Sequence, residues 1–275
     1  MEYVIPLSIF GGLGLLAGIL LTVASKVFAV KTDERLEAVS EALPQVNCGA
    51  CGFSGCNDYA DAIVNNGAEC NLCKPGGEAS AVKIGKIMGI EVAASEPYVA
   101  FVRCSGDCNT TPHKYDFDGV QSCAACNRFY NGSKLCTSGC LGYGDCVNVC
   151  PNGAISIVDR IAKVDKSKCT GCGLCAKACP NRLIAIRKIS QSVDVCCSSS
   201  DIAKITHSIC SRGCIGCKQC ERNCESGAIK IIDNHAVIDY DKCTNCGKCA
   251  EVCRIHSVRK LAENTDDMKI NNVKA

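Results

Sequence analysis

The sequence CTSGCLGYGDCVNVCP at residues 136–151 and the sequence CTGCGLCAKACP at residues 169–180 decide the fold of this chain. The second has the spacing C-x2-C-x2-C-x3-C-P, and the first reads C-x3-C-x5-C-x3-C-P. A loop as tight as Cys169–Cys175 can present three thiols to one centre, so a fourth thiol must come from elsewhere in the chain. The proline after the fourth cysteine prevents the chain from continuing as a helix.

This spacing is typical of proteins that hold [4Fe–4S] clusters. A cubane cluster needs four soft thiolate ligands, one for each iron. In two-cluster ferredoxins, the first three cysteines of a motif bind one cluster and the fourth binds the other. The stretch therefore predicts a ferredoxin-like unit with two clusters.

The stretch is repeated further along the chain at a fixed spacing. The segment from Gly153 to Cys169 aligns without a gap on the segment from Gly227 to Cys243. Seven cysteines fall on seven others, namely Cys140, Cys146, Cys150, Cys169, Cys172, Cys175 and Cys179 on Cys214, Cys220, Cys224, Cys243, Cys246, Cys249 and Cys253. A repeat at a fixed period indicates internal duplication, so we expect two ferredoxin-like units in tandem, each with a short hairpin.

The composition favours iron–sulfur chemistry over other uses of dense cysteine. The chain has 275 residues, 28 cysteines, no Trp and a formal charge of +2. A disulfide framework would have to separate thiols that the C-x2-C-x2-C loops crowd together. Zinc sites usually combine pairs of C-x2-C motifs, or Cys with His, and are the alternative. Clusters need free thiols and hence a reducing compartment, and the near-neutral charge gives no reason to expect nucleic acid binding.

An uncharged segment runs from Val4 to Ser25 and is long enough for a helix to cross a bilayer. A cleaved signal peptide would need positive charges before the apolar run. Here the side-chain charge before it is Glu2, and the positive charges of Lys26 and Lys31 follow it. We therefore expect residues 1–30 to be a transmembrane anchor, with the C-terminal domains on the cytoplasmic side.

A further cysteine motif follows this segment. Thr32-Asp33-Glu34 is a helix start signal, so a linker helix is expected within residues 31–47. The motif itself begins at Cys48, leads into an expected helix at Asn57–Val64 and ends at Cys73-Lys-Pro-Gly-Gly77. The thiols expected to hold one cubane are Cys48, Cys51, Cys56 and Cys73, with Cys70 as a spare.

The motif C-G-x-C-G-x-x-G-C-x-x-Y-A-x-A-I at Cys48–Ile63, followed by C-x-P-G-G at Cys73–Gly77, resembles the four-iron domain of the B subunit of the Rnf complex. The anchor, this domain and the ferredoxin repeats follow the order of that family and cover nearly the whole chain. The resemblance implies an electron-transfer subunit of an ion-translocating ferredoxin:NAD+ oxidoreductase in a prokaryotic cytoplasmic membrane. It also implies soluble reduced ferredoxin and other membrane subunits as partners, and those subunits would bind NAD and flavin.

Residues 81–103 predict a helix followed by a strand at Tyr98–Val102. Polar and aromatic residues alternate at Lys114–Gly119, which predicts another strand and a turn. Four cysteines of this region are expected to form a cluster site of their own: Cys104, Cys108, Cys123 and Cys126. The fourth ligand could instead come from Cys136, and zinc or plain thiols are the alternative to a cluster. Members of the Rnf family have a similar block with counterparts of the first three.

The first ferredoxin-like unit lacks one ligand of the usual pattern, because Tyr143 stands where the second unit has Cys217. Cys136, four residues before Cys140, is the expected substitute. The first unit would then use Cys136, Cys140, Cys146 and Cys179 for one cluster, and Cys150, Cys169, Cys172 and Cys175 for the other. The second unit would use Cys214, Cys217, Cys220 and Cys253, and Cys224, Cys243, Cys246 and Cys249. Extending the repeat upstream matches Cys123 with Cys197 and Cys136 with Cys210, and the roles of Cys196, Cys197 and Cys210 stay open.

These features together predict an α+β chain with a single N-terminal transmembrane helix, a small four-iron domain and tandem ferredoxin-like units. The expected divisions are 1–30 (anchor), 31–90 (linker helix and four-iron domain), 91–135 (extra cysteine-rich segment), 136–190 and 191–262 (ferredoxin-like units) and 263–275 (tail). We expect five to six [4Fe–4S] clusters and no catalytic residue, because no glycine-rich nucleotide motif or acid–base pair is present. A polyferredoxin subunit of another membrane complex, such as a hydrogenase, and a zinc-stabilised scaffold are the alternatives.

Overall fold

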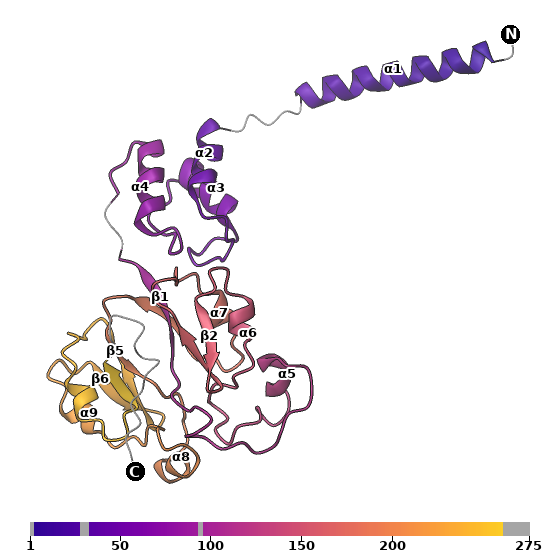
Figure 1. Cartoon of the computed structure of the whole chain (residues 1–275). Coiled ribbons are helices and arrows are strands. Elements are labelled where there is room, and N and C mark those ends of the chain that lie inside the picture. Colours follow the sequence, from indigo (N-terminus) through magenta and orange to yellow (C-terminus); the bar gives the residue numbers. More distant parts are fainter. Residues whose placement is uncertain (1–2, 28–32, 93–95, 261–275) are drawn as a thin grey trace.

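The computed structural model describes residues 3–27, 33–92 and 96–260 (Figure 1). Its helices are α1 Val4–Val27, α2 Glu34–Ala42, α3 Cys56–Asn66, α4 Gly77–Met88, α5 Cys123–Asn127, α6 Asp145–Asn148, α7 Leu174–Ala178, α8 Ala203–Ile209, α9 Gln219–Arg222 and α10 Lys248–Glu251. Its strands are β1 Tyr98–Val102, β2 Ile155–Val158, β3 Ile161–Val164, β4 Ile184–Lys188, β5 Val193–Val195, β6 Ile229–Ile232, β7 His235–Ile238 and β8 Val258–Lys260. The chain is therefore α+β, as expected, and the tail at 263–275 lies outside the described residues.

Helix α1 exposes large apolar side chains between Phe10 and Val23. Within the residues that the structure describes, no helix is both long enough and apolar enough to qualify as a membrane span. The transmembrane anchor expected at residues 1–30 is therefore not supported by the structure.

Helices α2, α3 and α4 form a small domain with its own core. The buried residues at its centre include Val39, Tyr59, Ile63 and Ile84. The predicted start of the linker helix is confirmed, because the Asp33 side chain caps α2 by accepting a hydrogen bond of 2.9 Å from the backbone N–H of Arg35. Helix α3 ends at Gly67, which has a φ of 65° and allows the left-handed cap that turns the chain back.

The two ferredoxin-like units share one topology. In the first, β1 pairs with β4 and β2 with β3; in the second, β5 pairs with β8 and β6 with β7, and all four pairs are antiparallel. Short helices follow the cysteine loops, α6 and α7 in the first unit and α9 and α10 in the second. Figure 1 shows the two units side by side, the second in orange and yellow. The hairpins and the strand expected at Tyr98–Val102 are confirmed.

The core of each unit is made of strand side chains and cysteines together. In the first unit, buried Ala100, Ile155 and Ile184 surround Cys146 and Cys175. The second unit repeats this arrangement, with Val193, Ile229 and Val258 around Cys214 and Cys249. The apolar side chains of the strands therefore pack against the thiols themselves, and not against an apolar core separate from them. This packing keeps water away from the thiols.

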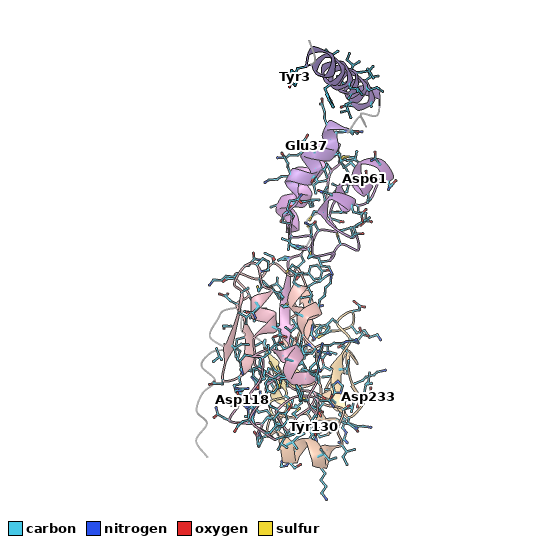
Figure 2. The ribbon with its side chains drawn as sticks, turned by 90° about the vertical axis from the view of Figure 1, so that its right-hand side faces the viewer. Tyr3, Glu37, Asp61, Asp118, Tyr130 and Asp233 are labelled. Carbon is cyan, nitrogen blue, oxygen red and sulfur yellow. The ribbon has the colours of Figure 1, made fainter. Side chains whose placement is uncertain are left out.

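The segment between β1 and α6 does not form the strand expected at Lys114–Gly119. Its aromatic side chains pack on one another instead, and the ring centroid of Phe117 lies 5.8 Å from that of Phe129 and 5.6 Å from that of Tyr143. The polar and aromatic alternation thus reflects aromatic packing and not strand pairing. Asp118 and Tyr130, labelled in Figure 2, lie on the exposed side of this segment.

A buried ion pair joins the two units. Arg187 of β4 pairs with Asp194 of β5, and the two side chains are 13% and 1% exposed. The Arg187 guanidinium lies 4.2 Å from the centroid of the Tyr240 ring, whose hydroxyl donates a hydrogen bond of 2.7 Å to Asp194. Burial raises the pKa of Asp194, and Arg187 opposes this rise by stabilising the carboxylate.

Candidate iron–sulfur cluster sites

All 28 cysteines are free thiols, and most are buried or half-buried. Within the described part of the chain, no group of three or more His, Cys, Asp or Glu side chains is placed so that it could hold a metal ion. A cubane uses its ligands differently from a single ion, because each thiolate binds a separate iron at a corner of the cluster. Its ligands are therefore spread around a cavity, and the structure contains several cavities lined by cysteines.

The four-iron domain contains a small cavity lined by thiols. Its thiols are the four that the sequence predicted, Cys48, Cys51, Cys56 and Cys73. Tyr59 also lines it, and its hydroxyl donates to the carbonyl of Glu69 at 2.6 Å and accepts from the N–H of Leu72 at 3.1 Å, which holds the loop before Cys73. Cys70 does not line this cavity and lies buried in the helical core.

A second cavity lies in the first ferredoxin-like unit, and its thiols are Cys150, Cys169, Cys172 and Cys175. The backbone N–H of Ala100 in β1 donates to the Cys169 sulfur at 3.3 Å, and that of Ala154 donates to the Cys150 sulfur at 3.4 Å. Hydrogen bonds of this kind stabilise a thiolate that ligates a metal. Gly171, with a φ of +66°, lets the ligand loop pack on β1, because a Cβ there would lie 2.6 Å from the Tyr98 carbonyl oxygen.

The second unit has the corresponding cavity, lined by Cys224, Cys243, Cys246 and Cys249. The other expected set of this unit, Cys214, Cys217, Cys220 and Cys253, is also brought together. Burial raises the pKa of Cys220 to about 12, and the neighbouring charges on Cys214, Cys253 and Cys217 add to the rise. Metal binding at these sites must therefore displace protons from the thiols.

The remaining set of the first unit differs from the expected one. Burial raises the pKa of Cys146 to about 12, and the charges that add to the rise are, in order, those of Cys140, Cys123 and Cys179. Cys123, at the start of α5, is thus the thiol beside Cys146 that was not expected there. The backbone N–H groups of Cys123 and Ala124 donate to the Asp145 carboxylate at 2.8 and 2.9 Å, which fastens α5 to the beginning of α6.

The four thiols expected to form a site between Cys104 and Cys126 are not brought together. Cys126 is buried beside Leu141 and Phe117, Cys108 is exposed, and Cys123 lies beside Cys146. Insertion of the segment that carries α5 explains this result, because it places α5 beside α6, on the side of the first unit away from the second unit (Figure 1).

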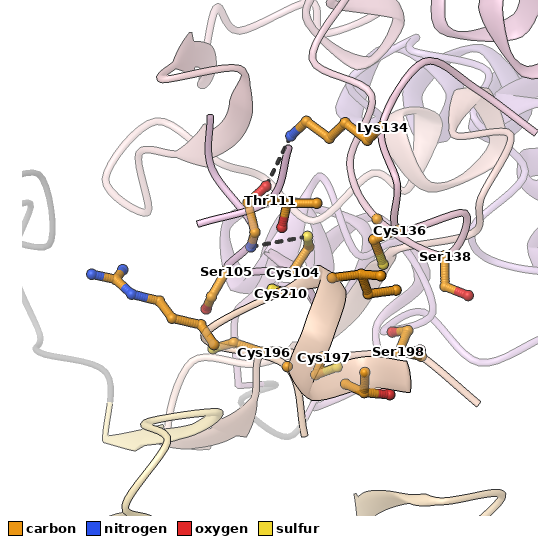
Figure 3. A pocket seen from close by; sticks show the side chains of 17 residues that line it. Cys104, Ser105, Thr111, Lys134, Cys136, Ser138, Cys196, Cys197, Ser198 and Cys210 are labelled. Carbon is orange, nitrogen blue, oxygen red and sulfur yellow. Dashed lines mark hydrogen bonds between the residues drawn. The ribbon is translucent and has the colours of Figure 1, made fainter. Parts of the chain in front are cut away.

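Cys104 lines another cavity, which we call the inter-unit cavity. Its other thiols are Cys136, Cys196, Cys197 and Cys210 (Figure 3). Cys136 therefore lies here, although the sequence predicted it beside Cys140 and Cys146. The sequence assigned no role to Cys196, Cys197 and Cys210 of the second unit. The pattern that could have indicated a site is that both units carry extra cysteines upstream of their first motif.

The four-iron domain contacts the first ferredoxin-like unit directly. The ammonium of Lys177 in α7 donates to the carbonyl oxygen of Cys48 at 2.6 Å, and the ammonium of Lys74 lies 4.8 Å from the centroid of the Tyr98 ring. The pKa of Cys172 is raised first by burial and next by the charge of Cys48. The cavity of the four-iron domain thus adjoins the one that contains Cys172.

Three family models match the chain in these regions. A model for an Fe-S cluster matches residues 43–75, a 4Fe-4S binding domain matches residues 162–185, and a 4Fe-4S dicluster domain matches residues 213–256. Together they indicate several [4Fe–4S] clusters in one chain.

Similar proteins cover nearly the whole chain. It is 44% identical over 248 residues to the B subunit of the ion-translocating oxidoreductase complex of Methanosarcina acetivorans, and the match covers 90% of this chain and 94% of the relative. It is 41% identical over 255 residues to the B subunit of the Na(+)-translocating ferredoxin:NAD(+) oxidoreductase complex of Acetobacterium woodii, covering 92% and 77%. It is 37% identical over 258 residues to the B subunit of the proton-translocating ferredoxin:NAD(+) oxidoreductase complex of Clostridium ljungdahlii, covering 92% and 91%.

Proposed function

Because the chain belongs to the family of B subunits of ion-translocating oxidoreductase complexes, we propose that it transfers electrons within such a complex through several [4Fe–4S] clusters. Reduced ferredoxin is the proposed electron donor, and NAD+ is the acceptor at another subunit. The observation that carries this proposal is the gathering of cysteines around cavities within the three matched regions. Similarity over about nine-tenths of the chain favours this function over a hydrogenase polyferredoxin.

We propose five ligand sets on the basis of the arrangement of the thiols. The first set lies in the four-iron domain and the others in the ferredoxin-like units: Cys48, Cys51, Cys56 and Cys73; Cys150, Cys169, Cys172 and Cys175; Cys123, Cys140, Cys146 and Cys179; Cys214, Cys217, Cys220 and Cys253; and Cys224, Cys243, Cys246 and Cys249. A [4Fe–4S] cluster supplies transfer of one electron at a time when it is bound.

The chain's own residues have three tasks in this proposal. The thiolates hold the irons, and backbone N–H groups such as those of Ala100 and Ala154 stabilise the thiolates. The strand side chains exclude water, which sets the local dielectric and hence the reduction potential. The contact between Lys177 and Cys48 keeps the four-iron domain against the first unit.

Attachment to the cytoplasmic membrane is proposed from the uncharged N-terminal segment of the sequence. The uncharged segment Val4–Ser25 would hold the chain to the membrane subunits as a single pass, with the cluster domains on the cytoplasmic side. Extraction of membranes with carbonate at high pH tests this, because an integral chain stays in the pellet. Release of the full chain into the supernatant would contradict the anchor while leaving the electron-transfer proposal intact.

The function is tested on the full chain purified without air. Six cubanes would contain about 24 irons with an equal amount of acid-labile sulfide, and five would contain about 20. Reduced ferredoxin should bleach the visible absorbance of the clusters and produce the EPR signals of reduced [4Fe–4S] centres. Absence of iron together with stoichiometric zinc would refute the proposal and favour a structural scaffold.

A further inference from the structure

The inter-unit cavity is built from equivalent positions of the two ferredoxin-like units. In the first unit Val102 of β1 pairs with Ile184, and in the second Val195 of β5 pairs with Val258, which the ungapped repeat matches with Ile184. Val102 and Val195 are therefore structural counterparts. Two residues further along, Cys104 of the first unit corresponds to Cys197 of the second.

Cys136 and Cys210 form a second equivalent pair, because each stands four residues before the first cysteine of its motif, Cys140 or Cys214. The chain between β1 and Cys136 is longer than the chain between β5 and Cys210, so the first unit carries an insertion between its two cysteines. Each unit thus contributes the same two thiols to one cavity, and the two pairs face each other across the boundary between the units (Figure 3).

The backbone is adapted to sulfur at this cavity. The N–H groups of Gly106 and Cys140 both donate to the Cys104 sulfur at 3.4 Å. A Cβ at Gly106 would lie 2.7 Å from the Thr111 hydroxyl oxygen, so glycine lets the chain pass close to Thr111 in the wall of the cavity. Backbone N–H groups also donate to the sulfurs of Cys169 and Cys150 in the second cavity.

The polar groups of the cavity favour an anion. Lys134 lines it and is only 1% exposed, and its ammonium donates to the carbonyl oxygens of Gly106 at 2.8 Å and Arg160 at 3.0 Å. Among the residues that the structure describes, no carboxylate lies within ion-pair distance of Lys134. A buried cation without an anion is costly, and a cluster with four thiolates carries net negative charge. The hydroxyl of Thr111, which also lines the cavity and is 1% exposed, has no hydrogen-bond partner in the structure.

We propose that Cys104, Cys136, Cys197 and Cys210 bind a further [4Fe–4S] cluster between the two ferredoxin-like units. The proposal rests on the electron-transfer function proposed above. Cys196 also lines the cavity but is not included, because its counterpart in the first unit is Arg103 and it has no equivalent thiol.

The position of this site between the two units suits it to electron transfer from one unit to the other. On one side, Cys104 accepts its hydrogen bond from the N–H of Cys140, a ligand proposed for the first unit. On the other side, Cys197 packs in the same core as Cys214, a ligand proposed for the second unit. A cluster here would therefore lie between the inner clusters of the two units and shorten the distance that an electron must cross.

The test compares four single variants of the full chain, purified without air, by iron and sulfide content. Cys104→Ala and Cys197→Ala should each lose about four irons per chain, because an incomplete set of ligands does not retain a cubane. Two matched controls should retain the wild-type content: Cys196→Ala, which lines the same cavity, and Cys108→Ala, which is exposed. EPR of the reduced chain should lose one signal in the first two variants, and the remaining irons show that those variants are folded.

Three results would overturn the proposal. Wild-type chain with about 20 irons, and no loss in Cys104→Ala or Cys197→Ala, would leave the five other sets and the electron-transfer function in place without this cluster. Loss of about four irons in Cys196→Ala but not in Cys197→Ala would show a different ligand set. One zinc per chain that disappears in Cys104→Ala would show a zinc site instead.

Discussion

Replacing Cys104 and Cys136 together by alanine should remove one cluster from the chain, whereas replacing Cys104 and Cys123 together should remove two. In the structure, Cys104 and Cys136 line the inter-unit cavity, and Cys123 lies beside Cys146 in another site. The motif spacing in the sequence predicts the opposite, because it groups Cys104 with Cys123 and Cys136 with Cys140. The two double variants therefore separate the two arrangements.

The magnitude follows from the stoichiometry of the sites. Each cubane holds four irons, so a chain with six clusters should contain about 24 irons, the Cys104→Ala/Cys136→Ala variant about 20 and the Cys104→Ala/Cys123→Ala variant about 16. The losses in the second variant should be additive, because the two thiols belong to separate sites without a shared ligand.

The assay is iron and acid-labile sulfide per chain after purification without air, with quantitative EPR after reduction. Cys126→Ala is the matched control, because this thiol is buried beside Leu141 and belongs to none of the proposed ligand sets. A loss of about eight irons from Cys104→Ala/Cys136→Ala, with about four from Cys104→Ala/Cys123→Ala, would refute the reasoning and restore the grouping expected from the sequence.

Three further outcomes are expected. Arg187→Ala should lower the free energy of unfolding by about 3–5 kcal/mol in denaturant titrations, because it leaves Asp194 buried without its partner. Since burial raises the pKa of Asp194 above its ordinary value of 3.8, the variant should lose stability as the pH rises above that value, and a pH-independent loss would contradict this assignment. Cys73→Ala should remove about four irons and Cys70→Ala none, and equal losses would show that Cys70 is a ligand. Lys134→Met should shift the potential of one cluster to more negative values in EPR-monitored redox titrations, because a nearby cation stabilises the reduced cluster, and unchanged potentials would separate Lys134 from any cluster.

Much of the fold follows from local patterns in the sequence. The C-x2-C-x2-C loops and the hairpins repeat at a fixed period, and both units have the expected hairpin, β2 with β3 and β6 with β7. The start of α2 at Asp33 could be predicted because a cap depends on a few neighbouring residues. The three thiols of each loop could be grouped for the same reason, since so short a loop cannot carry them far apart.

The alternation at Lys114–Gly119 shows where local patterns fail. A strand forms only where another strand is available to pair with it. In this segment the Phe117 side chain packs on Phe129 and Tyr143 instead. The same segment also makes the first unit longer than the second upstream of Cys136, so an alignment without a gap pairs the wrong cysteines there. Extending the repeat upstream without a gap places Cys123 opposite Cys197, whereas the strand register places Cys104 there.

The sequence by itself determined that this chain holds several [4Fe–4S] clusters and which loops are expected to carry most of their ligands, because both depend on thiols close together in the chain. Only the tertiary structure decided the positions of Cys104, Cys136, Cys197 and Cys210. Pairing of β1 with β4 and of β5 with β8 brings Cys104 and Cys197 to one cavity from distant positions in the sequence. The spacing of cysteines along the chain does not predict that Cys104 and Cys197 line one cavity, because their proximity depends on how the two units pack against each other.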